Sequence, residues 1–258
     1  VAVKVPKTQE AEESTREEAV ILQFLREKEQ HPNIIGFIAF DADLCALQLE
    51  WYGVTLRGVL EVRDPCLESA LFRHRLGRDL LSAIAFLHEN GIAHGDLKPS
   101  NLQIGRQGLK IIDFGSAMAM DDAGRLFDVA GTPLFFSHEK ALAWLDVIDP
   151  DDDQVAADDF KGFNAVWADV WAAALTIDCI ESREPDPANP DRLANSDELV
   201  WAIIRSDIEA HPRNKSSVYF ALLEAAFEDE ADFRPDASAF LALFDDFEPE
   251  ARRRDGAL

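Results

Sequence analysis

Residues 94–101 read HGDLKPSN, and twelve residues after the asparagine the chain reads DFG at residues 113–115. These stretches place an acid, a cation and an amide within six residues and add a second acid shortly afterwards. Asp96 can orient a hydroxyl nucleophile, and the ammonium group of Lys98 can neutralise charge on a group in transfer. The amide and the second acid carry oxygen atoms, which Mg²⁺ prefers as ligands. The two stretches together predict a magnesium-assisted phosphoryl-transfer site.

Composition narrows the class of protein. The chain has 258 residues, of which 47% are hydrophobic, so it is long and apolar enough for a globular core in one large domain or two lobes. Its 25 basic and 49 acidic side chains give a net charge of −24, which repels a phosphate backbone. We therefore expect no nucleic acid as a partner, whereas basic peptides are attracted.

The cysteines and the apolar runs bear on the compartment. Cys45, Cys66 and Cys179 form no CxxC pair, so we expect reduced thiols rather than a disulfide framework or a zinc site. No apolar run reaches the about 18 residues of a membrane helix, so no membrane partner is expected. The sequence predicts an intracellular protein, with the cytoplasm as the expected compartment and the nucleus as the alternative.

The first fifty residues predict a small sheet with one helix. Runs that alternate or are rich in β-forming residues predict strands over residues 1–5, 34–40 and 44–51. Apolar residues three and four apart predict a helix over residues 14–28, capped by Ser14 or Thr15. Three strands and one helix cannot bury a core alone, so they require the rest of the chain as a packing partner.

The remainder predicts a larger and mainly helical part. Apolar spacing predicts helices over residues 68–90, 167–180, 218–227 and 237–247. Two short apolar runs around Gly105 and Gly108 predict a β-hairpin over residues 102–112. Gly77 inside the first of these helices is expected to cost about 1 kcal/mol relative to alanine. Acidic or proline-rich segments at residues 149–159 and 182–191 are expected to be solvated surface insertions.

The HGDLKPSN and DFG stretches resemble the catalytic and metal-binding loops of the eukaryotic-type serine/threonine protein kinase family. Lysine two residues after Asp96 resembles the serine/threonine-directed branch. The resemblance implies an α+β, bilobal protein-kinase-like fold. Its expected parts are a truncated small lobe at residues 1–52, a hinge at about 49–53, a helical large lobe at 53–250 and a tail at 251–258. It also implies ATP and Mg²⁺ as cofactors, and protein serine and threonine hydroxyls as substrates.

The resemblance assigns the ATP-binding residues. Residues 1–4 resemble the family's VAxK strand, in which Lys4 contacts the phosphates and Ala2 lines the adenine site. Glu18 begins the family's E-x-x-I-L helix pattern and orients Lys4 through an ion pair. The remaining ATP-site positions lie at the hinge and under the adenine: Leu49 as gatekeeper, the carbonyl of Glu50, the N–H of Tyr52, and Gln103 where the family has an apolar floor.

The resemblance also assigns the catalytic and supporting residues. Asp96 is the base that orients the substrate hydroxyl, Lys98 stabilises the transferred phosphoryl group, and Asn101 and Asp113 coordinate Mg²⁺. Seven further positions have supporting roles in packing, anchoring or substrate contact: His94, Phe114, Gly115, Thr132, Glu139, Asp169 and Arg234. Among these we expect Asp169 to anchor the catalytic-loop backbone and Glu139 to pair with Arg234. We also expect His94 and Phe114 to stack with Leu22 and Phe37 in a column that links the lobes.

The sequence departs from the family pattern in four places, of which the polar Gln103 beneath the adenine is one. No glycine-rich loop precedes Lys4, so lower ATP affinity is expected, and either a fragment or a late natural start explains its absence. Gly95 replaces the arginine that commonly receives an activation-loop phosphate, and residues 117–130 contain no Ser, Thr or Tyr. We therefore expect a site that loop phosphorylation does not switch. Ser137 and His138 replace the usual Ala-Pro, which affects substrate docking rather than the fold.

Two other functions compete with protein phosphorylation. A pseudokinase or scaffold would keep these motifs but turn over little, because the phosphate cover is missing and Gln103 is polar. Small-molecule kinases of the aminoglycoside and choline type share the HGD triplet at residues 94–96. They are not expected to combine it with the GTPLFF, ADVW and FRP strings found further along this chain.

Overall fold

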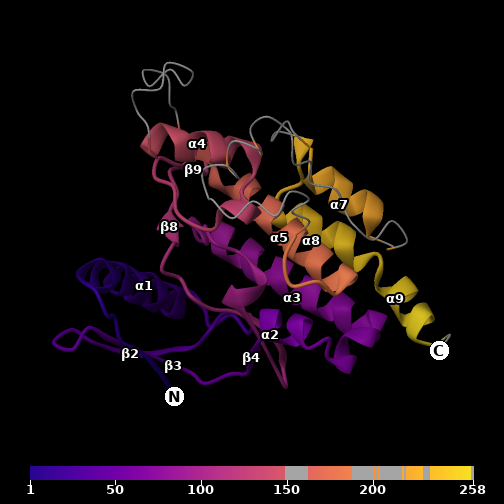
Figure 1. The fold of residues 1–258 in the computed structure, drawn as a ribbon, viewed down its shortest axis with the longest axis horizontal. Helices are drawn as coiled ribbons and strands as arrows, with labels where there is room; N and C mark the ends of the chain where they lie inside the picture. Colours follow the sequence, from indigo (N-terminus) through magenta and orange to yellow (C-terminus); the bar gives the residue numbers. More distant parts are fainter. Residues whose placement is uncertain are drawn as a thin grey trace.

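The computed structural model describes residues 1–148, 162–187, 200, 203, 217, 219–228 and 233–256. Figure 1 shows an α+β fold in which a small sheet with one helix lies beside a larger helical body. The small sheet is antiparallel, has the strand order β1-β3-β2, and consists of β1 (Ala2–Lys4), β2 (Phe37–Asp41) and β3 (Ala46–Leu49). The bilobal protein-kinase-like fold expected from the sequence is therefore confirmed.

Helix α1 (Gln9–Lys28) packs against this sheet and begins earlier than expected. Its N-cap is Thr8, whose side chain accepts a hydrogen bond from the N–H of Ala11 at 3.3 Å. The predicted start and the predicted caps were wrong, because Ser14 and Thr15 lie inside the helix. Ser14 instead donates to the carbonyl of Gly115 at 3.0 Å, so α1 is tied to the DFG stretch at residues 113–115.

The larger body is built around α3 (Ala70–Glu89), which is capped by Ser69 and Asn90 and followed by Gly91 at a φ of 72°. The other α-helices of this body are α2 (Leu56–Glu61), α4 (His138–Ile148), α5 (Ala165–Ser182), α7 (Phe220–Ala226), α8 (Ala237–Asp245) and α9 (Glu248–Asp255). Of these, α5, α8 and α9 pack against α3. Helix α5 is buried on nearly every face, as its apolar sequence predicted.

Of the tail expected at residues 251–258, the structure describes residues 251–256, and most of these are helical. Helix α9 continues through Asp255 and packs along α3, with Ala251 buried. The carboxylate of Asp255 accepts hydrogen bonds from Ser69 Oγ at 2.5 Å and from the N–H of Ala70 at 2.6 Å. The last residue of α9 therefore caps the start of α3, although the two lie far apart in the sequence.

Short strands position the loops between the two halves. The predicted hairpin forms from β6 (Leu102–Gly105) and β7 (Gly108–Ile111), and β4 (Val54–Thr55) pairs with β6. Two further antiparallel pairs join β5 (Ile92–Ala93) to β8 (Met118–Ala119), and β9 (Arg125–Leu126) to β10 (Phe163–Asn164). A parallel bridge between Ile34 and Ile111 connects the small sheet's entry loop to the hairpin. These pairings fix residues 94–101 and 113–115 side by side.

The predicted surface insertions are only partly within the described residues. Residues 149–159 lie outside them, as do residues 188–191. In the described part of the second segment, Asp186 pairs with Arg57 at 2.6 Å, with both side chains about two-fifths exposed. Within the described ranges, no helix has both the length and the apolar character needed to cross a bilayer.

Gly77 in α3 is required by packing rather than merely tolerated. A Cβ added there would lie 2.6 Å from Cζ of Phe244, a ring that is 1% exposed and stacked on Tyr219 at 4.4 Å. We expect Gly77→Ala to lower the free energy of unfolding by about 1–3 kcal/mol, although alanine is the better helix former. Urea denaturation measures the change.

Gly256→Ala is the matched control for this substitution. Gly256 has a φ of −78°, and the nearest atom to an added Cβ lies 3.6 Å away. We expect its free energy of unfolding to stay within about 0.5 kcal/mol of the parent. Equal stability of the Gly77→Ala variant and the parent would show that the Phe244 ring moves aside at little cost.

Candidate active site

Lys4, Glu18 and Asp113 meet at the junction of the two halves. The Lys4 Nζ atom lies 2.7 Å from Glu18 Oε2 and 2.7 Å from Asp113 Oδ1, an acid 109 residues away in the sequence. Strand β1 supplies the lysine, α1 the glutamate and the loop after β7 the aspartate. Glu18 is completely buried, whereas the other two side chains remain 40% and 47% exposed. All three residues also line a cavity.

The electrostatics of this cluster favour the ionised forms. Burial alone would lower the pKa of Lys4, but its hydrogen bonds to Asp113 and Glu18 outweigh that effect and raise it. Burial opposes ionisation of Asp113 as well, yet the bond from Lys4 holds its pKa below the ordinary value. Both groups therefore carry their charges at neutral pH.

Glu18 also links α1 to the DFG stretch. Its Oε1 atom accepts a hydrogen bond from the N–H of Phe114 at 2.9 Å. The fully buried ring of Phe114 meets His94 edge-on, with the ring centroids 5.1 Å apart. Leu22 and Phe37 belong to the same hydrophobic cluster. The four residues expected to form a column are thus part of one packed core.

The catalytic-loop residues form a second polar cluster. Asp96 Oδ2 accepts hydrogen bonds from Lys98 Nζ at 2.6 Å and from Asn101 Nδ2 at 2.9 Å. Asp96 Oδ1 accepts one from the Thr132 hydroxyl at 2.8 Å, and that hydroxyl also contacts Lys98. Thr132 reaches the loop from just before the short helix at Pro133–Phe135. One carboxylate therefore organises a cation, an amide and a hydroxyl.

Asp169 at the start of α5 anchors this loop from behind. Its two carboxylate oxygens accept from the N–H groups of His94 at 2.8 Å and Gly95 at 3.0 Å, and it also contacts His88 at 3.1 Å. Burial raises the pKa of Asp169, but the contact with His88 and the neighbouring His94 outweigh it, so the pKa is lowered. The backbone anchor predicted for Asp169 has the expected geometry.

Asn101 and Asp113, the two residues expected to coordinate Mg²⁺, lie on neighbouring segments of the chain. The N–H of Ile112 donates to the carbonyl of Asn101 at 2.9 Å, which fixes the residue before Asp113 beside the asparagine. Asp113 has a φ of 58°, a conformation sparsely populated outside glycine and frequent at functional sites. No cluster of three or more His, Cys, Asp or Glu side chains suited to a metal occurs among the described residues. An asparagine and an aspartate both carry side-chain oxygen atoms, the kind of ligand that Mg²⁺ prefers.

A cavity of about 260 Å³ lies next to these clusters. Its lining includes every residue assigned to ATP from the sequence: Ala2, Lys4, Glu18, Leu49, Glu50, Tyr52 and Gln103. The side-chain oxygen of Gln103 accepts a hydrogen bond from the N–H of Gly53 at 3.4 Å, so this polar group has a partner. Trp51 also lines the cavity and is 73% exposed, a position that the sequence reading did not assign.

Glu139 and Arg234 form the long-range ion pair expected between α4 and the segment before α8. The two contacts measure 2.6 Å and 3.2 Å, and the Arg234 side chain is fully buried. Arg234 also donates to the carbonyl of Glu228 at 2.7 Å and lies over the ring of Trp171. This arginine joins three elements of the larger body.

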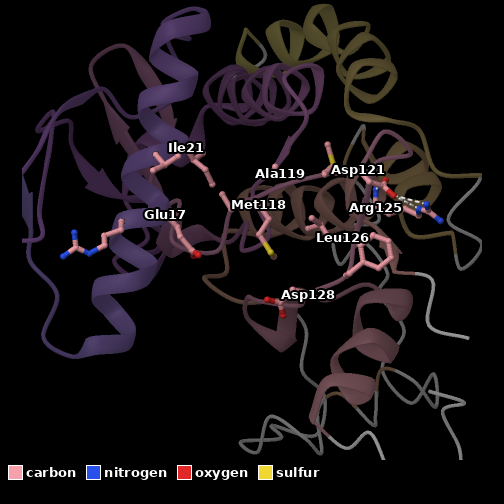
Figure 2. A pocket seen from close by; sticks show the side chains of 13 residues that line it. Glu17, Ile21, Met118, Ala119, Asp121, Arg125, Leu126 and Asp128 are labelled. Atoms are coloured by element: carbon pink, nitrogen blue, oxygen red, sulfur yellow. Dashed lines mark hydrogen bonds and ion pairs between the residues drawn. The ribbon is translucent and has the colours of Figure 1, made fainter. Parts of the chain in front are cut away.

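A larger hollow, of about 880 Å³, separates α1 from residues 117–128 (Figure 2). Its far wall is organised by Asp121, which accepts from the N–H groups of Ala123 at 2.9 Å and Arg125 at 2.8 Å. The Asp121–Arg125 ion pair, dashed in Figure 2, closes the same turn at 2.9 Å. The turn at residues 121–125 is therefore closed by its own contacts, while the pairings of β8 with β5 and of β9 with β10 hold the segment on either side of it.

Lys140 is the residue near the site that sequence analysis missed. It is 6% exposed, and its Nζ atom donates to the carbonyl of Gly95 at 2.5 Å. From the local sequence, a lysine that follows Glu139 near the start of a helix is predicted to be an exposed charge. The one sequence signal for such a residue is Gly95 itself. Because it replaces the family's arginine, another basic side chain could supply the positive charge near the catalytic loop.

The fold and these two clusters define a protein kinase domain, and comparison with known proteins agrees. The family model described as "Protein kinase domain" matches residues 1–242. The chain therefore belongs to the protein kinase family, whose members use a nucleotide and a divalent metal ion and act on protein substrates.

Individual relatives are similar at modest identity. CBL-interacting protein kinase 25 of Oryza sativa subsp. japonica is 30% identical over 189 residues, covering 69% of this chain and 32% of that protein. The serine/threonine-protein kinase PknB of Mycobacterium tuberculosis is 32% identical over 158 residues, covering 55% and 24%. A death-associated protein kinase related protein of Drosophila melanogaster is 28% identical over 137 residues, covering 52% and 20%. The matched region thus spans between a fifth and a third of the length of these relatives.

Proposed function

We propose that this chain transfers the γ-phosphoryl group of ATP, with Mg²⁺, to serine and threonine hydroxyls of proteins. The observation that carries the proposal is the convergence of Lys4, Glu18 and Asp113 within 2.7 Å contacts at the edge of a cavity. A cation held by two acids beside a cavity suits a polyphosphate. The similarity to named serine/threonine kinases supports the same class of substrate.

On this proposal, Lys4 binds the phosphates and Glu18 keeps its ammonium group in place. Asn101 and Asp113 would hold Mg²⁺, which would supply positive charge against the phosphates. The Lys4 ammonium group exchanges its contact with Asp113 for the phosphates, which frees that carboxylate for the metal ion. The pairing with buried Glu18 persists, so the ammonium group is not displaced.

The catalytic loop handles the acceptor hydroxyl. Asp96 accepts a hydrogen bond from the substrate serine or threonine and takes its proton as the hydroxyl oxygen attacks the γ-phosphorus of ATP. The bond from the γ-phosphorus to the bridging oxygen of ADP breaks in the same step, and ADP leaves with the electron pair. Lys98, 2.6 Å from Asp96, provides positive charge next to the group in transfer. Thr132 donates to the other oxygen of Asp96 and thereby holds the carboxylate plane against the loop.

Adenine occupies the 260 Å³ cavity in this proposal. Leu49 closes its inner end, the Glu50 carbonyl and the Tyr52 N–H make the adenine contacts, and Ala2 covers one face. Gln103 forms the opposite face, where its bond to the N–H of Gly53 reduces the cost of a polar floor. The small lobe then corresponds to residues 1–52 and the large lobe to residues 53–250.

Magnesium-dependent ATP binding gives the first test. With ATP at about 100 times its dissociation constant, the free energy of unfolding should rise by about 2.7 kcal/mol. Asp113→Asn should abolish the part of this gain that requires Mg²⁺, because the carboxylate ligand is lost. Asp43→Asn, on the turn after β2, is the matched control and should keep the full gain. Thermal denaturation with ATP, with and without Mg²⁺, measures both.

Phosphate transfer to a basic peptide with one serine completes the test. Transfer that stops in an Asp96→Ala variant supports the proposal. Magnesium-dependent ATP binding without transfer to any protein or peptide would favour a scaffold. Phosphorylation of a small alcohol, with none on protein, would favour the small-molecule kinases that share the HGD triplet.

A further inference from the structure

Lys140 lies in the first turn of α4 with its ammonium group enclosed by protein. Its Nζ atom contacts the Gly95 carbonyl at 2.5 Å and lies 4.8 Å from the ring centroid of Phe136 and 6.0 Å from that of Phe163. Lysine is among the residues least often buried, because removing an ammonium group from water is costly. A buried lysine directly behind a catalytic loop calls for a specific role.

Three acids face this ammonium group, and each comes from a different element. Asp169 lies at the start of α5, Asp96 in the catalytic loop, and Glu139 beside Lys140 on α4. Desolvation lowers the pKa of Lys140 to about 8, against the attraction of these acids. At neutral pH the group is therefore charged, and it balances part of the negative charge gathered around the loop.

Two glycines shape the backbone around Lys140. Gly95 has a φ of +78°, and a Cβ there would lie 2.5 Å from the carbonyl oxygen of Ser116. Gly131 has a φ of +121°, and its Cβ would lie 2.5 Å from the Gly95 oxygen and 3.3 Å from Lys140 Nζ. The catalytic loop (residues 94–101), the activation segment (residues 113–139, from the DFG stretch to Glu139) and α4 thus meet at one point. Only residues without a side chain can pass through that point in these conformations.

The activation segment offers no other anchor of this kind. Residues 117–130 contain no Ser, Thr or Tyr, so no phosphate can be attached within them. Within the first half of the segment, the Asp121 turn is closed by its own contacts. The second half returns to the catalytic loop at Gly131 and Thr132, next to Lys140.

We propose that Lys140 is a positioning residue for phosphoryl transfer. Its buried ammonium group fixes the Gly95 carbonyl and the Gly131 backbone, so that Thr132 and Lys98 stay bonded to Asp96 without a phosphate on the segment. This inference rests on the proposed function. It assigns the role of the positive charge that is missing at position 95 to the side chain of Lys140, which comes from α4.

Hydrogen exchange of the amides tests the positioning directly and needs no catalysis. The protein is first shown by mass spectrometry to carry no phosphate. In Lys140→Met we expect amide exchange at residues 131–136 to become at least about tenfold faster. The reason is that the ammonium group between the Gly95 carbonyl and the Gly131 backbone is then missing. Exchange in the β6–β7 hairpin should not change. Lys110→Met is the matched control, since Lys110 is also buried, at 5% exposure, but contacts Glu50 and the Ile34 carbonyl instead.

The pH dependence of the unmodified protein gives a second test that requires no substitution. Protection of residues 131–136, corrected for intrinsic exchange, should be full below pH 8 and fall as pH rises through about 8, because the neutral amine no longer attracts the three acids. The free energy of unfolding of the whole protein should rise, not fall, over the same pH range. Between pH 8 and 10.5 the unfolded chain keeps a proton on Lys140 that the folded chain has lost. The stability of the parent relative to Lys140→Met should therefore rise with pH in this window.

Activity separates this inference from the function on which it rests. With transfer established, Lys140→Met should lower kcat/KM for the basic peptide about tenfold and leave the ATP dissociation constant unchanged. Wild-type exchange and wild-type kcat/KM in that variant would overturn the positioning role while the proposed function stands. Altered exchange at residues 131–136 in a protein that transfers no phosphate would instead overturn the function alone. If Lys140→Met does not fold, unchanged protection of the parent between pH 7 and 9.5 overturns the positioning role.

Discussion

Replacing Asp96 with asparagine is expected to lower kcat for phosphate transfer to a serine peptide by about 10²–10⁴-fold, while the ATP dissociation constant changes less than about threefold. The amide has nearly the same shape but cannot take the hydroxyl proton. Its single oxygen can replace only one of the two carboxylate oxygens, so it cannot accept the bonds from Lys98 and Asn101 on one atom and the bond from the Thr132 hydroxyl on the other. Steady-state kinetics and nucleotide titration of the same preparation measure the two quantities.

Asp64→Asn is the control for the isosteric change. Asp64 caps the short helix at Pro65–Glu68 by accepting from the N–H of Cys66 at 2.9 Å, far from the cluster around Asp96. Its kcat should match that of the parent. Retention of more than a tenth of the parent kcat in Asp96→Asn would mean that this carboxylate does not accept the proton.

Replacing Arg234 with methionine is expected to lower the free energy of unfolding by about 3–5 kcal/mol. The substitution removes two bonds to Glu139, one to the Glu228 carbonyl and the contact with the Trp171 ring. It also leaves the Glu139 carboxylate, only 23% exposed, without its bidentate partner. Chemical denaturation followed by tryptophan fluorescence and by circular dichroism measures the loss.

Arg57→Met is the matched control for this prediction. Arg57 also pairs with two acids, Glu61 at 2.8 Å and Asp186 at 2.6 Å, but its side chain is 41% exposed. We expect this variant to lose less than about 1 kcal/mol. The double variant Arg234→Met, Glu139→Met should recover part of the loss, because no buried charge then lacks a partner. Similar losses at Arg234 and Arg57 would contradict a structural role for the buried pair.

Most of the fold could be predicted because its helices carry strong local signals. The run at residues 167–180 is apolar on all sides, and the observed α5 is buried almost throughout. Asn90 and Gly91 stop α3 where a C-terminal cap was expected. The first turns of α1 were missed because they are charged and show no apolar periodicity. Helix α9 was missed for the same reason, since its place is fixed by the bonds of Asp255 to the start of α3.

The functional residues could be predicted wherever they belong to a short sequence motif. Asp96, Lys98 and Asn101 lie within one short string, and the structure brings them into one hydrogen-bonded cluster. Lys140 and Gly77 carry no such signal. Burial of the lysine depends on α4, α5 and the catalytic loop converging, and the need for glycine at 77 depends on Phe244, a ring from another helix. Such requirements exist only once the chain is packed.

The close approach of Gly95 to the Ser116 carbonyl limits how this domain could acquire a phosphate-operated switch. An arginine introduced at position 95 would collide with that oxygen and adopt an unfavourable left-handed backbone. The Ser116 peptide would have to turn first, and the arginine would then compete with Lys140 for the same region of negative potential.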